Sequence, residues 1–149
     1  IQGATAAGLD VGVYFFTQAV NQVEAVEEAS MVVQLIEDYD LTYPVFIDTE
    51  GAGGDGRADS LDVETRTLVC DAFCTTIKNA GYDAGVYASR NWLNEKLISD
   101  KLEEHIIWLA EYRDTPLYQG YYQMWQYSSS GKIDGIEGRV DINLSYIDE

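Results

Sequence analysis

The chain has 149 residues, 46% of them hydrophobic, which is enough to bury the core of one domain. Its formal net charge of −17 argues against a nucleic-acid partner, because phosphate binding needs clustered lysines and arginines and the nine here are scattered. No apolar run approaches the roughly 20 residues of a membrane-spanning helix, so membrane insertion is not expected.

The first quarter of the chain predicts a strand followed by an amphipathic helix. The strand covers residues 11–16, and Asn21 with Glu24 then forms a capping-box pattern. Apolar residues recur at helical spacing and predict the buried face. They are Val23, Val26, Ala29, Val33 and Ile36. The glutamates at positions 24, 27, 28 and 37 are expected largely on the opposite, solvated face.

The segment from Pro44 to Gly51 is the most informative part of the sequence. An apolar run over 45–47, typical of a strand buried on both faces, ends in Asp48 and Glu50. Because alternate residues of a strand share a side, both carboxyl groups are expected to project together. Such a pair raises one pKa, as acid catalysis near neutral pH requires. A helix cap or a solvated turn is the alternative interpretation.

The middle of the chain predicts a glycine-rich loop and a second helix. The loop over 51–56 lacks lysine and carries Asp55, so its glycines are expected to give flexibility or close approach to a ligand rather than a phosphate site. The helix runs over about 62–80, with Gly81 as its C-terminal cap. Its predicted inward residues are Leu68, Val69, Ala72, Phe73 and Ile77.

Cysteine and histidine offer little material for a metal site or a catalytic triad. Cys70 and Cys74 are four residues apart with no second pair to complete a zinc site, so packed thiols are expected. His105 is the only histidine, and a solvated or capping role is expected for it.

The second half predicts further strands with thinner connections. Strands are expected over 84–88, 106–110, 122–127 and 140–144, with a short, weak helix between 91 and 104. Alternating strands and helices are typical of a parallel α/β fold, here with an irregular second half.

Carboxylates, amides and aromatic side chains gather at the predicted strand ends. These residues are Phe16, Asp48, Glu50, Ser89, Glu111, Tyr112, Gln126, Tyr127 and Asp141. In barrels of parallel strands this end carries the active site, and aromatic faces with carboxylates suit sugar binding and glycoside cleavage. The alternative is that Trp108 and Trp125 belong to the core and that Asp141 simply ends a strand.

Six segments in order resemble the family 25 glycoside hydrolases, the lysozyme-like muramidases of bacteria and their phages. They are 8–16 (GLDVGVYFF), 44–50 (PVFIDTE), 81–89 (GYDAGVYAS), 107–112 (IWLAEY), 124–128 (MWQYS) and 138–143 (GRVDIN). No single segment is specific, but six in the family's order are. The resemblance implies an irregular (β/α) TIM-like barrel with few helices, and the chain is expected to form one partial catalytic domain over 1–149.

The resemblance also implies hydrolysis of the β-1,4 bond between N-acetylmuramic acid and N-acetylglucosamine in peptidoglycan, outside the cell or at the wall. Glu50 matches the general acid/base, and Asp48 the carboxylate that assists the acetamido group or stabilises the transition state. Asp141 matches a third acidic residue at the end of the last strand. The implied sugar-binding residues are Tyr14, Phe16, Tyr87, Trp108, Tyr112, Trp125 and Gln126. No metal and no organic cofactor is implied.

The chain departs from the family pattern at its beginning. The family's first strand, with its aspartate, and its second strand are absent, and Asp10-Val11-Gly12 only mimics the first motif. The barrel is therefore expected to be truncated, with two open sheet edges that invite self-association, and activity of the fragment is a separate question. A non-catalytic glycan-binding barrel fragment and a hydrolase of another N-acetylated glycan, such as chitin, are the alternatives.

Overall fold

The computed structural model describes residues 1–147, which form a six-stranded sheet with helices beside it. The strands are β1 (Val13–Phe16), β2 (Val45–Asp48), β3 (Ala84–Ser89), β4 (Ile106–Ala110), β5 (Met124–Gly131) and β6 (Val140–Ser145). The helices are α1 (Gln2–Ala6), α2 (Gln22–Ile36), α3 (Val63–Asn79), α4 (Arg90–Glu95) and the 3₁₀ helix η1 (Ser99–Leu102). None of these helices has the length and apolar character to cross a membrane.

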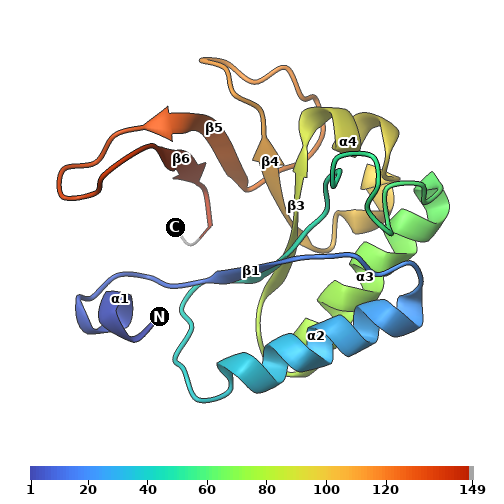
Figure 1. The fold of residues 1–149 in the computed structure, drawn as a ribbon, viewed down its shortest axis with the longest axis horizontal. Helices are drawn as coiled ribbons and strands as arrows, with labels where there is room; N and C mark the ends of the chain where they lie inside the picture. The colour runs from blue at the N-terminus through green and yellow to red at the C-terminus, as the bar shows by residue number, and fades with distance from the viewer. Residues whose placement is uncertain (148–149) are drawn as a thin grey trace.

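The strands lie in the sheet in their sequence order, so β1 and β6 are its edges. Strands β1 to β5 pair in parallel, whereas β6 pairs antiparallel with β5. A parallel return needs a crossover of a dozen or more residues, and the stretch between Gly131 and Val140 is too short for one. The predicted mixed α/β fold with few helices is confirmed, but the described sheet is a curled half-barrel and not a closed barrel (Figure 1).

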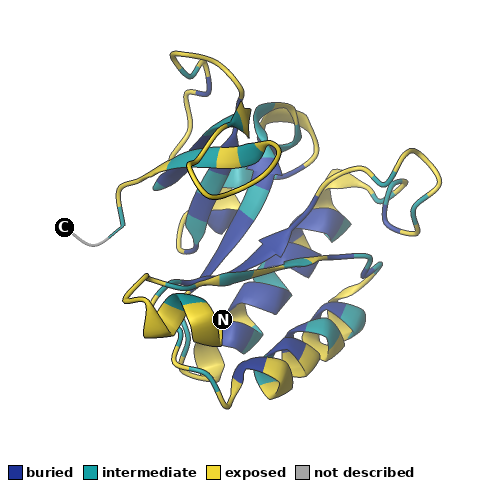
Figure 2. Cartoon of the chain, turned by 60° about the vertical axis from the view of Figure 1, so that its left-hand side comes forward, coloured by how far each residue is buried: buried dark blue, intermediate teal, exposed yellow. Residues whose placement is uncertain are grey.

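The core lies between the sheet and helices α2 and α3, which pack side by side on one face of it (Figure 1). Strand β2 is buried at all four positions, as its apolar run predicts. The largest fully buried side chains include Phe73 and Ile77 from α3 and Ile47 from β2. Figure 2 shows the buried residues concentrated in the central strands and in the helix faces turned toward them. This rigid layer fixes the carboxyl ends of β2, β3 and β4.

The buried face of α2 matches the predicted one only in part, because Ala29 and Ile36 are buried and Val33 is half-buried as expected, but Val23 and Val26 are not. Ala25, Ala29, Val32 and Ile36 are buried, whereas Val23 is 68% exposed and Val26 41% exposed. Helix α2 packs against α3, and this contact orients its buried face. The N-terminus of α2 follows the prediction in part. The Asn21 side chain accepts the backbone N–H of Glu24 at 2.9 Å, but the Glu24 carboxylate accepts from Val20 and Arg57 instead of Asn21.

Two further side chains on the helices lie differently from the prediction. Glu28 is half-buried, because its carboxylate accepts the hydroxyl of Thr17 at 2.9 Å. Leu68 is 41% exposed on α3, although Val69, Phe73 and Ile77 are buried as predicted.

The glycine-rich loop after β2 wraps around an internal carboxylate. Asp59 accepts backbone N–H groups from Ala52 at 2.9 Å, Gly54 at 2.7 Å and Gly56 at 3.3 Å, and these bonds lower the pKa of Asp59. Gly53 and Gly54 have φ of 81° and 91°, in the left-handed region that favours glycine. The glycines therefore serve an ordered loop, a role that the sequence did not predict.

Arg66 fixes the second half of the same loop from α3. Its side chain is 2% exposed and donates to the carbonyl oxygens of Ala58 at 3.0 Å and Leu61 at 3.1 Å. The guanidinium also lies 4.3 Å from the centre of the Trp92 ring, within the range of a cation–π contact. A buried arginine thus ties the loop that follows β2 to α3 and α4.

The cysteines lie as predicted, but the histidine does not. Cys70 and Cys74 are free, fully buried thiols, as predicted, and burial raises the pKa of Cys70 to about 12. The prediction of a solvated or capping His105 is wrong. His105 is 2% exposed, and its Nε2 lies 2.8 Å from Oδ1 of Asp71 on α3.

Candidate active site

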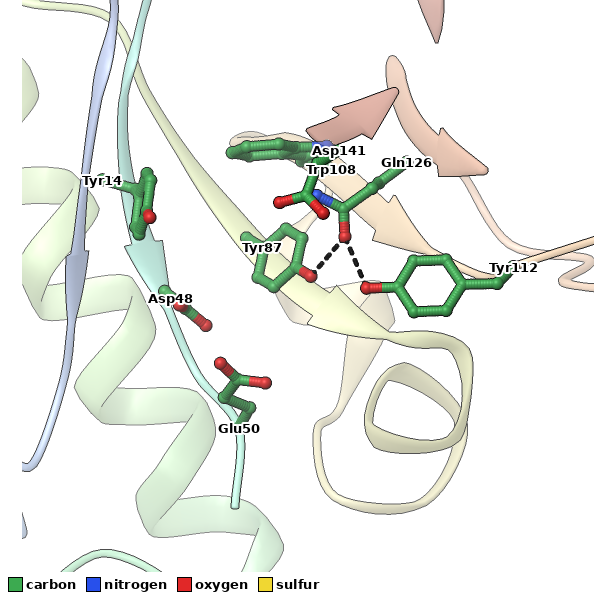
Figure 3. A pocket seen from close by; sticks show the side chains of 8 residues that line it. All are labelled: Tyr14, Asp48, Glu50, Tyr87, Trp108, Tyr112, Gln126 and Asp141. Carbon is green, nitrogen blue, oxygen red and sulfur yellow. Dashed lines mark hydrogen bonds between the residues drawn. The ribbon is translucent and has the colours of Figure 1, made fainter. Parts of the chain in front are cut away.

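A cavity of about 250 Å³ opens at the carboxyl ends of the parallel strands. Its lining comes from all six strands and from the segments that follow β2 and β4 (Figure 3). The lining residues are Tyr14, Asp48, Glu50, Tyr87, Trp108, Tyr112, Gln126 and Asp141. All eight belong to the set that the sequence predicts for the site.

Asp48 and Glu50 project from β2 and its extension into the same cavity, as strand alternation predicts (Figure 3). Asp48 is 6% exposed, whereas Glu50 is exposed. Burial raises the pKa of Asp48 to about 7, and the neighbouring charge of Glu50 and a hydrogen bond with it act in the same direction. Oδ1 of Asp48 has no hydrogen-bond partner among the described residues. The pair therefore holds a proton near neutral pH, on the more buried carboxyl group.

Asp141 faces this pair from the opposite side of the cavity (Figure 3). It was expected at the end of the last strand, but it is the second residue of β6. Since β6 runs antiparallel to β5, its beginning lies at the edge of the sheet where the parallel strands end. Because β6 runs in the reverse direction, Asp141 reaches the cavity from the beginning of the last strand and not, as predicted, from its end.

Aromatic rings line the cavity between the carboxylates. Trp108 packs edge-on against Tyr87 with ring centres 4.7 Å apart and against Tyr14 at 6.4 Å. Its Nε1 donates to Oδ1 of Asn143 at 2.8 Å, which holds the indole in place. Asn143 was not predicted as a site residue. Its position two residues after Asp141, on the same side of β6, is the signal that could have found it.

Gln126 accepts hydrogen bonds from the hydroxyl groups of two tyrosines. Its Oε1 accepts the hydroxyl of Tyr87 at 2.7 Å and that of Tyr112 at 2.8 Å (Figure 3). Gln126 is 4% exposed, and burial raises the pKa of Tyr87. The Tyr87 phenol therefore stays protonated as a donor, and the two hydroxyl groups together fix the orientation of the amide.

Two predicted sugar-binding residues do not line the cavity. Trp125 is 6% exposed, belongs to the hydrophobic core and donates its Nε1–H to the carbonyl oxygen of Glu111 at 2.9 Å. Phe16 is 39% exposed at the end of β1 but lies outside the lining. Trp125 therefore belongs to the core, which is the alternative interpretation that the sequence left open for it.

Within residues 1–147, the group with metal-ligand spacing consists of Asp71, Glu104 and His105. None of them lines the cavity, and the His105 Nε2 is already engaged by Asp71. In the cavity itself, carboxyl groups, amide and phenols offer acid/base chemistry and hydrogen bonding to a polyhydroxylated ligand.

The raised pKa of Asp48 has a consequence for stability. Asp48→Asn is expected to increase the free energy of unfolding by about 1–3 kcal/mol at pH 8 and to change it little at pH 4. At pH 4 the carboxyl group is protonated in the folded state and about half protonated in the unfolded chain, so the two states differ little in bound protons. Between the unfolded pKa of about 3.9 and the folded pKa of about 7, only the unfolded chain loses the proton, so wild-type stability falls as pH rises.

Urea unfolding of both proteins at the two pH values measures this difference. Asp134→Asn, at an exposed position, is the matched control and should show no such pH dependence. Equal stabilisation by Asp48→Asn at pH 4 and pH 8 would contradict the assignment of the titrating group.

Comparison with known proteins places this geometry in context. The model of the glycosyl hydrolases family 25 matches residues 1–136. The autolytic lysozyme of Clostridium acetobutylicum is 30% identical over 142 residues, which are 95% of this chain and 41% of that protein. The chain therefore spans less than half the length of this curated relative.

Solved structures share the fold. The modular autolysin LytC from Streptococcus pneumoniae, in complex with a synthetic peptidoglycan ligand, superposes with a TM-score of 0.85 at 32% identity, over 96% of this chain and 35% of that one. The catalytic domain of endolysin ply40 from bacteriophage P40 of Listeria monocytogenes gives 0.80 at 24% identity, over 97% and 71%. At that identity the second likeness shows the fold alone.

Proposed function

The chain belongs to glycosyl hydrolase family 25, and we propose that it hydrolyses the β-1,4 bond between N-acetylmuramic acid and N-acetylglucosamine in the peptidoglycan of bacterial walls. The observation that carries the proposal is the cavity with the Asp48–Glu50 pair on one side, Asp141 opposite and aromatic rings between them. Carboxyl groups flanking a sugar-sized space are what glycoside hydrolysis requires. The lysozyme name of the relative supports the choice of substrate.

In the proposed mechanism Glu50 protonates the leaving oxygen and Asp48 orients the 2-acetamido group, which attacks the anomeric carbon. Retaining enzymes with a protein nucleophile place carboxyl groups about 5–5.5 Å apart across the sugar, and inverting enzymes about 6.5–9.5 Å apart. Two neighbours on one strand approach the sugar from a similar side and fit neither arrangement. Asp141 as a conventional base from the opposite side is the runner-up mechanism.

The proton that the pair holds near neutral pH fits this division of roles. In the free protein burial keeps it on Asp48, whose pKa is about 7. An acetamido N–H arriving at Asp48 favours the charged form of that carboxyl group, because it donates a hydrogen bond. The proton then passes to Glu50, from which it reaches the leaving oxygen.

Loss of turbidity of a bacterial wall suspension tests the proposed activity, and analysis of the new reducing ends identifies the bond. Muramic acid at the new reducing end supports the proposal, whereas glucosamine there indicates a glucosaminidase. Binding to walls with no new reducing ends would favour a non-catalytic glycan-binding role.

The mechanism predicts net retention and an obligatory N-acetyl group on the sugar at the cleavage site. Proton NMR of the first-formed anomer measures the stereochemistry, and a glycan de-N-acetylated at that sugar should be cleaved at a strongly reduced rate. A first product of inverted configuration, or undiminished cleavage of the de-N-acetylated glycan, would exclude substrate assistance and favour Asp141 as the base.

A further inference from the structure

The side-chain amide of Gln126 has one end occupied by the protein and one end free. Its Oε1 accepts two hydroxyl groups, from Tyr87 on β3 and Tyr112 after β4, which uses both lone pairs of the oxygen. Among the described residues no acceptor receives the hydrogens of its Nε2, and that nitrogen is not sealed away from the cavity. The amide therefore presents two N–H donors to whatever occupies the space (Figure 3).

This donor differs chemically from its surroundings. The neighbouring polar groups of the lining are carboxyl groups and phenols, which can accept hydrogen bonds from sugar hydroxyls. The Gln126 amide cannot accept, because its oxygen is filled, so it complements an atom that only accepts. On a glycan, the carbonyl oxygen of an N-acetyl group is such an atom.

We propose that Gln126 is the specificity-determining residue of this site and reads the carbonyl oxygen of an N-acetyl group on the bound glycan. The inference rests on the proposed function, since it assumes that a glycan occupies the cavity. A glucan with a hydroxyl group at C2 lacks that carbonyl and offers the Gln126 N–H groups only a hydroxyl close to the ring, which is a donor as well as an acceptor. Sites built around one polar partner discriminate strongly against ligands that lack it.

Tyr87 and Tyr112 act on recognition through Gln126 as positioning residues. A free amide side chain could turn by half a revolution and present its oxygen to the cavity. Two hydroxyl donors on Oε1 remove that option. Tyr87 is itself held edge-on by Trp108, so the orientation of the amide depends on rings from β3 and β4.

Binding titrations on the purified chain test the proposal, with the change in tryptophan fluorescence as the signal, because Trp108 lines the cavity. The probes are tetra-N-acetylchitotetraose and cellotetraose, two neutral tetramers that differ in the group at C2. Gln126→Glu keeps an acceptor for both tyrosines but turns an acceptor toward the cavity. It should weaken binding of the acetylated tetramer about tenfold and change cellotetraose binding by less than about twofold.

The matched control is Gln34→Glu, which makes the same charge change at an exposed position of α2 and should keep the wild-type preference. Tyr112→Phe removes one of the two hydroxyl donors from a ring that is 55% exposed, and it should reduce the preference by a smaller factor. This variant decides the matter if Gln126→Glu fails to give a cooperative melting transition.

The outcomes separate the inference from the function on which it rests. A folded Gln126→Glu variant with undiminished preference for the acetylated tetramer overturns the role of Gln126 but leaves glycan binding standing. An unchanged preference in Tyr112→Phe, where Gln126→Glu does not fold, overturns it as well. A wild-type chain that binds neither tetramer overturns the inference and counts against the proposed function.

Discussion

Glu50→Gln is expected to lower the rate of wall hydrolysis by about 10²–10⁴-fold, the contribution of a positioned general acid. The substitution keeps the shape of the side chain and removes its titratable proton. Glu50 is exposed at the cavity, so the amide can be solvated there without a cost to folding. The effect should therefore fall on the chemical step and leave glycan binding nearly unchanged.

Release of reducing ends from purified walls gives the rate, and a thermal melt shows whether the variant is folded. Glu37→Gln is the matched control, because Glu37 is an exposed carboxylate at the C-terminus of α2, away from the cavity. A folded Glu50→Gln variant that lyses walls at a near-native rate would remove Glu50 from the mechanism.

Arg66→Met is expected to lower the free energy of unfolding by about 3 kcal/mol, because each buried carbonyl left without a donor costs about 1–3 kcal/mol. The carbonyl oxygen of Leu61 loses its charged donor, and that of Ala58 keeps only the backbone N–H of Leu61 at 3.2 Å. The contact with Trp92 also loses its charge. Methionine retains most of the aliphatic volume, so the loss comes chiefly from the missing hydrogen bonds.

Urea unfolding measures this loss as a shift of the midpoint at constant slope. Arg139→Met, at an exposed position, is the control and should change stability by less than about 0.5 kcal/mol. An unchanged midpoint for Arg66→Met would mean that water replaces the guanidinium at the loop carbonyls, and the loop would then not depend on α3 for its order.

Alternation along strands explains both the success and the failure of the site prediction. Asp48 and Glu50 are two residues apart, and the structure brings both into one cavity. Gln126 and Trp125 are adjacent on β5, so one strand cannot turn both side chains to the same side. Strand alternation alone therefore predicts that only one of these two residues can line the cavity. The packing of β5 decides which one, because Trp125 lies in the core.

Other features depend on contacts between distant segments. The orientation of α2 follows from its packing against α3, which buries Ala25 and Val32 and leaves Val23 and Val26 exposed. The partner of His105 is 34 residues away in the chain, on α3, and no local sequence pattern predicts it. The direction of β6, by contrast, could have been read from the short connection that precedes it.

The two buried thiols make it possible to measure how readily the core opens. Cys70 and Cys74 lie on α3 with no exposed surface, and burial raises the pKa of both, so the native chain offers almost no reactive thiolate. A thiol-specific reagent at pH 8 would modify only molecules in which α3 has separated from the sheet. Its labelling rate under native conditions would then report the free energy of that separation, without denaturant or an introduced probe.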